Sequence, residues 1–156
     1  YGYGLVSNKW LFKKFKGQIG LIGAKEKIDL IKNLMEREEY QNYLGLGQFE
    51  DYINFPQKFA ADDLDILEEI VKPQLEKSTA KIFLLGIGHA KNGILNKFKS
   101  YKSAIYLDIG GGIDMLSGCI STNRPYAAGW TNYRLNNYDY SNIDYMNYNH
   151  ANEKHI

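Results

Sequence analysis

The sequence has little cysteine, no basic excess and no long apolar run, and each absence excludes a class of protein. Cys119 is the one cysteine in 156 residues, so no intramolecular disulfide forms. A single thiol suits a reducing compartment and most often serves as a small buried apolar side chain. A formal net charge of +1 argues against a nucleic-acid-binding domain that works by charge alone. No run approaches the roughly 18 apolar residues of a membrane span.

The first ten residues, YGYGLVSNKW, lack the basic and apolar regions of a signal peptide. We therefore expect a cytoplasmic protein. The same stretch lacks an initiator Met and begins partway through a sequence pattern, so we expect the chain to be a piece of a longer protein. A length of 156 residues with 44% hydrophobic content predicts one domain with a real core.

Strand-like and helix-like stretches alternate along the chain about four times. The first unit predicts a strand at Ile19–Ile22, a turn at Gly23 and an amphipathic helix that Gly45 and Gly47 end. The stretch FEDYINFP predicts a weaker strand, closed by Pro56. A second helix follows in ADDLDILEEIVKPQLEK, where Pro73 kinks or restarts it.

Two apolar runs complete the pattern. KIFLLGIG is nearly continuous, as expected for a strand covered on both faces, and HAKNGILNKF is its helix. SAIYLDIG predicts another covered strand, followed by a glycine turn and a short helix to Ile120. The alternation predicts an α/β, Rossmann-like parallel sheet flanked by helices, with its core at about residues 17–120. Residues 121–156 are rich in Tyr and Asn and predict an irregular segment that wraps the surface, frayed from about Asn147.

The stretch GIGHAKNG places two glycines at a strand end and a polar turn after them. Gly86 and Gly88 would let the backbone approach a ligand, and the next helix would point its N–H groups at a phosphate. The spacing is neither GxGxxG nor a Walker A motif. His89 suits phosphate binding or acid–base chemistry, and Lys91 suits a phosphate partner. The alternative is a tight turn with solvated side chains.

The stretch LDIGGGID offers two carboxylates beside a glycine turn that begins at Gly110. Asp108 and Asp114 would hold a divalent cation on a diphosphate or orient a sugar hydroxyl. Asp114 is equally explained as a carboxylate in the first turn of a helix. The acidic residue near a glycine run is also similar to the first motif of S-adenosylmethionine-dependent methyltransferases, although that motif usually opens such a fold.

Two further stretches carry polar residues of interest. DDLD at residues 62–65 matches a metal-binding DxD, but its place at a helix start favours capping. NRPYAAGWTNYR supplies two arginines for phosphate and aromatic rings for stacking. We interpret Arg124 as a binding residue and Trp130 as a packing residue, with Arg134 and Tyr126 as further candidates.

The order of GLIGAKEKIDLI, INFPQKFAADDLDILEEI, KIFLLGIGHAKNGIL and SAIYLDIGGGIDM resembles the GT-D class of glycosyltransferases, a former family of unknown function, over Gly17 to about Leu116. The resemblance implies a domain that transfers a sugar from a nucleotide sugar, usually UDP-linked, to a saccharide or glycoprotein acceptor, with a divalent metal such as Mn or Mg. The family's metal-binding Asp-x-Glu lies upstream, and residues before Gly17 do not contain it.

We therefore expect a nucleotide-sugar-binding glycosyltransferase domain. Its predicted catalytic residues are Asp108, Asp114 and His89, with Asp108 the first choice of general base. The predicted donor-binding residues are Gly86, Gly88, Lys91, Gly110 and Arg124. Two alternatives remain: a methyltransferase-like cofactor domain, and a non-catalytic transferase-like module that docks on other domains of the same polypeptide.

Overall fold

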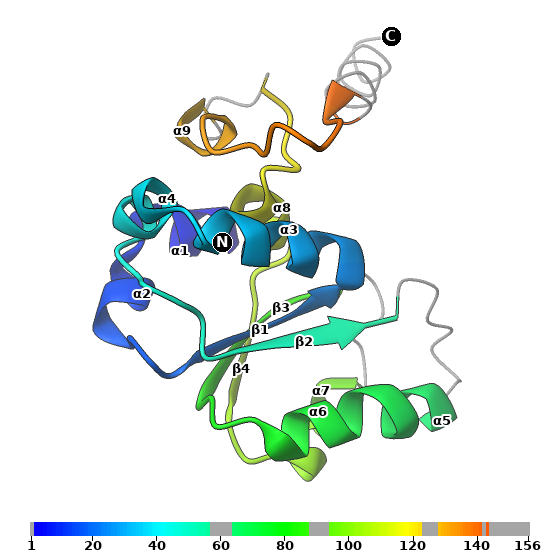
Figure 1. The fold of residues 1–156 in the computed structure, drawn as a ribbon. Coiled ribbons are helices and arrows are strands. Elements are labelled where there is room, and N and C mark those ends of the chain that lie inside the picture. Colours follow the sequence, from blue (N-terminus) through cyan, green and yellow to red (C-terminus); the bar gives the residue numbers. More distant parts are fainter. Residues whose placement is uncertain (1, 57–63, 88–93, 123–127, 142, 144–156) are drawn as a thin grey trace, which may run out of the picture.

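Four parallel strands form a single sheet at the centre of the molecule (Figure 1). The computed structural model describes residues 2–56, 64–87, 94–122, 128–141 and 143. The strands lie in the order β2-β1-β3-β4, with bounds Ile19–Ala24 for β1, Asp51–Phe55 for β2, Ile82–Gly86 for β3 and Ile105–Asp108 for β4. The alternating pattern in the sequence thus predicted the α/β, Rossmann-like class correctly.

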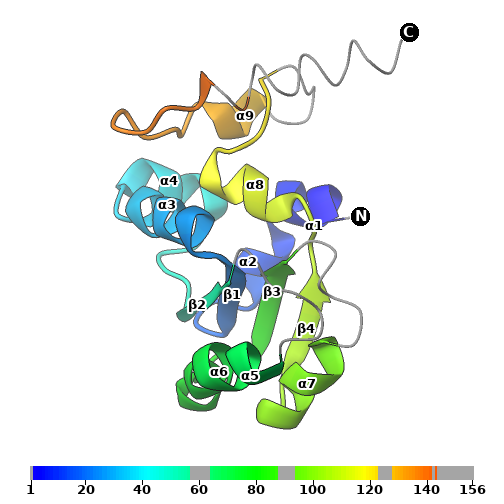
Figure 2. The ribbon, with the colours of Figure 1, turned by 90° about the vertical axis from the view of Figure 1, so that its right-hand side faces the viewer.

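Helices cover both faces of the sheet, which Figure 2 shows as three layers. One face carries α1 (Gly2–Asn8), α2 (Trp10–Lys14), α3 (Lys25–Met35), α4 (Glu38–Leu44) and α8 (Gly112–Ser117). The other carries α5 (Leu64–Ile66), a π-helical turn (Leu67–Val71), α6 (Lys72–Lys77) and α7 (Ile94–Tyr101). The short α9 (Ala128–Thr131) lies outside the first helical layer. Two separate apolar clusters therefore form, one on each face of the sheet.

The central strands follow the sequence prediction with one correction. β3 is buried along its length except at Gly86, as its continuous apolar run predicts. β1 does not turn at Gly23 as expected, because the strand continues to Ala24 and α3 begins at the next residue. Gly23 stays extended because it pairs with β2 and β3 on both sides.

The expectation that the strand SAIYLDIG is covered on both faces is wrong. β4 is an edge strand of the described sheet, paired with β3 alone. Ile105 is 57% exposed, and the other three residues of β4 are half-buried. Asp108 therefore does not sit at the end of a dry, fully covered strand.

The two long predicted helices are each broken. The first divides into α3 and α4 at residues 36–37, and Gly45 ends α4 in the left-handed conformation, with φ of 74°. The second contains the π-helical turn and then restarts as α6, with Pro73 in the first turn of α6. Proline lacks the N–H that an interior helical position donates, so it fits this start.

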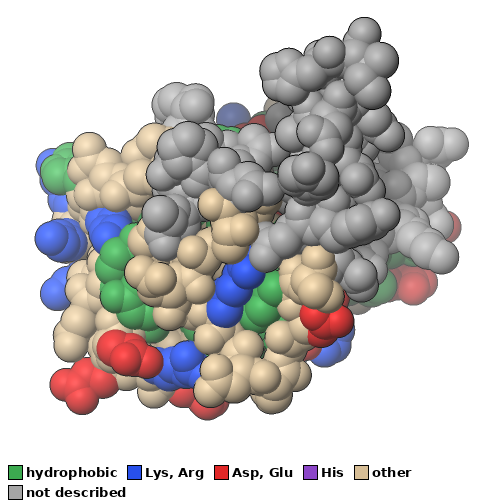
Figure 3. Space-filling model, turned by 90° about the horizontal axis from the view of Figure 1, so that it is seen from above, with side chains coloured by type: hydrophobic (Ala, Val, Ile, Leu, Met, Phe, Trp, Pro, Cys, Tyr) green, Lys and Arg blue, Asp and Glu red, His purple; other side chains and the backbone are tan. Residues whose placement is uncertain are grey.

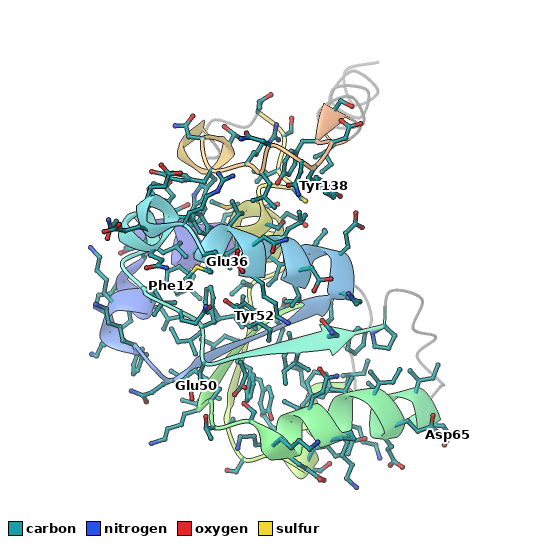
Figure 4. The ribbon with its side chains drawn as sticks, in the orientation of Figure 1. Phe12, Glu36, Glu50, Tyr52, Asp65 and Tyr138 are labelled. Atoms are coloured by element: carbon teal, nitrogen blue, oxygen red, sulfur yellow. The ribbon has the colours of Figure 1, made fainter. Side chains whose placement is uncertain are left out.

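The N-terminal helices were not predicted from the sequence, yet they complete the core. Leu11 and Phe12 of α2 are buried, and Figure 4 shows Phe12 on the face of the sheet that α3 covers. The ring of Phe12 meets that of Phe49 edge to face at 5.8 Å between centroids. The N-terminal segment is therefore part of the domain rather than an appendage.

The C-terminal segment packs against the same helical layer. Trp130 is 2% exposed, which confirms its interpretation as a packing residue, and Leu135 and Tyr140 are also buried. Arg134 donates to the carbonyl oxygens of Gly118 (3.0 Å) and Ile120 (2.6 Å), so its guanidinium serves the end of α8. The expected frayed stretch from Asn147 lies outside the described residues.

Within the described part of the chain, no helix combines the length and apolar character needed to cross a membrane.

Candidate functional site

The carboxyl ends of the four strands meet at one edge of the sheet, where parallel α/β folds bind their ligands. The chain runs from β1 outward to β2 and then returns to the far side of β1 as β3. The reversal therefore lies between β1 and β3, where Gly23 pairs with Gly86. Asp108 pairs with Leu85 one strand further along.

Protein atoms fill the space beside Gly86. A Cβ on Gly86 would lie 2.6 Å from the Cβ of Ile113 and 3.3 Å from the carbonyl oxygen of Gly110. Ile113 is 1% exposed, and one of its methyl groups also lies 3.7 Å from the Cβ position of Gly23. Because glycine has no side chain, α8 can pack on the sheet at Gly86. This packing by itself explains why residue 86 is a glycine.

The glycine run after β4 has a similar explanation. Gly110 has φ of +50° and nothing within 4 Å of its Cβ position, so it forms the turn. A Cβ on Gly111 would lie 2.6 Å from Cζ of Tyr3, and one on Gly112 would lie 2.8 Å from Cγ2 of Val6. Gly111 and Gly112 therefore allow α1 to approach α8.

Asp108 has a structural partner in this turn. Its Oδ1 accepts a hydrogen bond of 2.9 Å from the backbone N–H of Gly110. An aspartate that bonds the backbone two residues on stabilises a turn. Together with its half-buried position, this bond supplies the structural role that the sequence alone did not reveal.

Four of the predicted site residues lie outside the described part of the chain: Gly88, His89, Lys91 and Arg124. The same holds for Tyr126 and for Asp62 and Asp63 of the DDLD stretch, whereas Asp65 lies in α5.

An open hollow lies one strand away from the glycine-lined ends, where β2 ends beside the start of α3. Its volume is about 490 Å³, within the range of small-molecule sites. Its walls come from the first turns of α3, the end of β2 and the π-helical turn: Lys25, Glu26, Asp29, Asn54, Phe55, Pro56 and Ile70. We call this hollow the β2 pocket.

Asn54 lines the β2 pocket and carries an unsatisfied polar atom. Its Oδ1 is buried and has no hydrogen-bond partner among the described residues. Its backbone is fixed by Gln74, whose side-chain amide accepts from the N–H of Asn54 (3.1 Å) and donates to its C=O (3.3 Å). The amide of Gln74 also donates to the carbonyl of Ile70 at 2.7 Å. Gln74 thus holds two walls of the pocket together.

The start of α3 brings charges of both signs to this pocket, the cation Lys25 and the carboxylates of Glu26 and Asp29. Ala24, the residue before the helix, has no side chain that could cap the first N–H groups. Lys25 pairs with Asp29 at 2.5 Å, with side chains 73% and 43% exposed. An exposed pair four residues apart contributes only a few tenths of a kcal/mol, so a bound anion can compete for Lys25.

A second, smaller hollow of about 210 Å³ lies on the other side of the first turn of α3. Asp114 of α8 forms an ion pair there with Lys27, and Cys119 also lines the wall. Glu26 lines both hollows and accepts a hydrogen bond from the hydroxyl of Tyr138, which raises the pKa of Tyr138. Figure 4 shows Tyr138 on the outer side of α3.

The two predicted carboxylates therefore have different partners, Gly110 for Asp108 and Lys27 for Asp114. Burial raises the pKa of Cys119, which is 9% exposed, so its thiol is neutral at physiological pH. Among the described residues no three His, Cys, Asp or Glu side chains gather in a way that could hold a metal ion. These residues do not fit the divalent metal that the resemblance implies, and we derive no step through one.

Sequence reasoning missed the residues of the β2 pocket, Asn54 and Lys25 above all. One signal was present, because GAKEK follows the first strand as a helix start and Asn54 stands two residues before Pro56. What the sequence could not reveal is that these two strand ends are neighbours.

Comparisons of the chain with models of protein families, with curated proteins and with solved structures return no match.

Proposed function

We propose that this domain binds a nucleotide sugar in the β2 pocket and serves as the donor-binding part of a glycosyltransferase. The observation that carries the proposal is the convergence of three features on one hollow at the carboxyl edge. These features are the uncapped start of α3, the cation Lys25 and the buried, unpartnered Oδ1 of Asn54.

Each feature matches one part of a nucleoside diphosphate. Phe55, Pro56 and Ile70 offer an apolar surface for the nucleoside. The Oδ1 of Asn54 would accept from an N–H of the base or an O–H of the ribose. The N–H groups at the start of α3, which no side chain caps, would take the diphosphate with Lys25, beside the carboxylates of Glu26 and Asp29.

The transfer step itself rests on the resemblance to GT-D enzymes. In such a step the bond between the anomeric carbon and the phosphate oxygen breaks, and the acceptor oxygen bonds to that carbon. The acceptor proton then passes to a base. Asp114 is the better placed of the two described candidates, because it lies in the hollow that shares Glu26 with the β2 pocket. Its carboxylate forms an ion pair with Lys27.

Calorimetric titration with UDP and UDP-sugars tests donor binding. Ile70 is 43% exposed and lines the pocket, so Ile70→Trp should narrow it and weaken UDP binding at least tenfold. Ile105→Trp is the matched control, because Ile105 is exposed on β4 and does not line the pocket. Equal affinities for the two variants would overturn the assignment.

Asn54→Leu gives a second, independent test. An unpartnered buried oxygen costs free energy in the unbound fold, so its removal should leave the melting temperature unchanged or higher. UDP binding should weaken in the same variant. Binding of S-adenosylmethionine in place of UDP would favour the methyltransferase-like alternative, and binding of neither would favour the non-catalytic module.

A further inference from the structure

Positive charge is concentrated at the N-terminal end of the chain. Residues 1–25 contain five lysines and no acidic residue, whereas all 18 acidic residues lie beyond residue 25. The formal net charge of +1 therefore conceals a basic N-terminal segment on an otherwise acidic chain. Such an asymmetry indicates an anionic partner.

The helix α2 presents part of this charge together with an exposed aromatic ring. Trp10, Lys13 and Lys14 stand three and four positions apart, so they share one face of the helix. Trp10 is 53% exposed, and the two lysines are exposed as well. The Nζ of Lys14 lies 4.8 Å from the centroid of the Trp10 ring.

Neighbouring residues extend the same surface. The ring of Phe15 meets that of Trp10 edge to face at 6.1 Å, and Lys16 is exposed directly after it. We call Trp10, Lys13, Lys14, Phe15 and Lys16 the α2 patch. In Figure 3, Lys and Arg side chains gather at the left-hand edge, on the side where α2 lies in Figure 1.

The face of α2 opposite the patch packs into the core. Leu11 and Phe12, on the opposite face of α2, are 5% and 1% exposed and belong to the main core. A partner that meets the patch therefore does not need to order the helix first. Preorganisation of this kind lowers the entropic cost of association.

We propose that the α2 patch binds the surface of a membrane that contains anionic phospholipids. An exposed indole with lysines around it is the combination that settles at the boundary of headgroups and acyl chains. The cytoplasmic leaflet carries anionic lipids, and each lysine near it strengthens binding about fivefold. The patch has no arginine and a single strongly exposed ring, which disfavours a nucleic acid.

Binding to a membrane through α2 would leave the carboxyl edge of the sheet accessible to ligands. Figure 1 shows α2 at the end of the sheet where the strands begin, whereas β2 ends on the opposite side. A domain seated on a membrane through α2 would keep the β2 pocket open to water. This proposal does not depend on what that pocket binds.

Cosedimentation of the whole chain with vesicles tests the proposal. The chain should bind phosphatidylcholine vesicles that contain about 30% phosphatidylserine, bind pure phosphatidylcholine at least tenfold more weakly, and dissociate at about 0.5 M salt. Lys14→Gln with Lys16→Gln should weaken binding about twentyfold. The control, Lys77→Gln with Lys99→Gln, removes the same charge from exposed positions on α6 and α7 and should change binding less than twofold.

Fluorescence supplies a second readout. Lipids brominated in their acyl chains should quench Trp10, whereas Trp130 is buried at 2% exposure and should stay bright. Trp10→Ala should abolish the quenching. Equal binding by the two lysine double variants, quenching that survives Trp10→Ala, or tighter binding to duplex DNA than to the vesicles would each overturn the proposal.

Discussion

Replacing Gly86 with alanine separates a packing role of this glycine from a role in binding a ligand. The added Cβ would lie 2.6 Å from the Cβ of Ile113, a distance that real Cβ atoms do not show. Ile113 is buried and branched at Cβ, so it can move only if α8 moves. Overpacking of this kind costs 1–3 kcal/mol, so we expect a loss of about 2 kcal/mol.

For a chain of this size that loss lowers the melting temperature by about 4–8 °C. Thermal unfolding followed by circular dichroism measures it. Gly47→Ala is the matched control, because nothing lies within 4 Å of its Cβ position and its backbone is not left-handed. The control should be neutral or slightly stabilising. A Gly86→Ala variant that melts normally but no longer binds UDP would refute the packing explanation.

Three further outcomes follow from the contacts described above. Asp114→Asn should cost less than about 1 kcal/mol in urea unfolding, because its pair with Lys27 is about one-third exposed, and a larger loss would make the carboxylate structural. Gln74→Leu should lower the free energy of unfolding by about 1–2 kcal/mol and weaken UDP binding, because the hydrogen bonds from Gln74 to Asn54 and Ile70 are lost. An unchanged free energy of unfolding would contradict this role of Gln74. Stability should fall as pH rises above 10, because burial raises the pKa of Tyr106 to about 12 and that of Tyr40 well above its ordinary value, so the unfolded chain loses these protons first. Spectrophotometric titration that shows every tyrosine ionising near pH 10 with the fold intact would contradict the last expectation.

The sequence predicted the fold well where periodicity reflects burial. A continuous apolar run predicted that β3 is buried, and Pro56 predicted where β2 ends. Both predictions depend on local properties of a strand, and both are confirmed. The π-helical turn before Pro73 and the extended backbone at Gly23 were not predicted, because hydrogen bonds and strand pairing decide them.

The candidate site was harder to predict, because a glycine pattern does not say what approaches the glycine. At Gly86 the neighbour is Ile113, and at Gly111 it is Tyr3, far away in the sequence. Asp108 was expected at the end of a covered strand, but the edge position of that strand depends on tertiary structure. Asn54 became a candidate only when strand order placed it beside Gly23.

An amide NMR titration of the isotope-labelled chain with UDP tests the central claim most directly. The β2 pocket predicts saturable shifts at residues 24–29, at the start of α3, and at residues 53–55, at the end of β2. These shifts should be lost in Ile70→Trp and kept in Ile105→Trp. An unchanged spectrum, or shifts confined to other parts of the molecule such as α2, would contradict nucleotide binding at this edge.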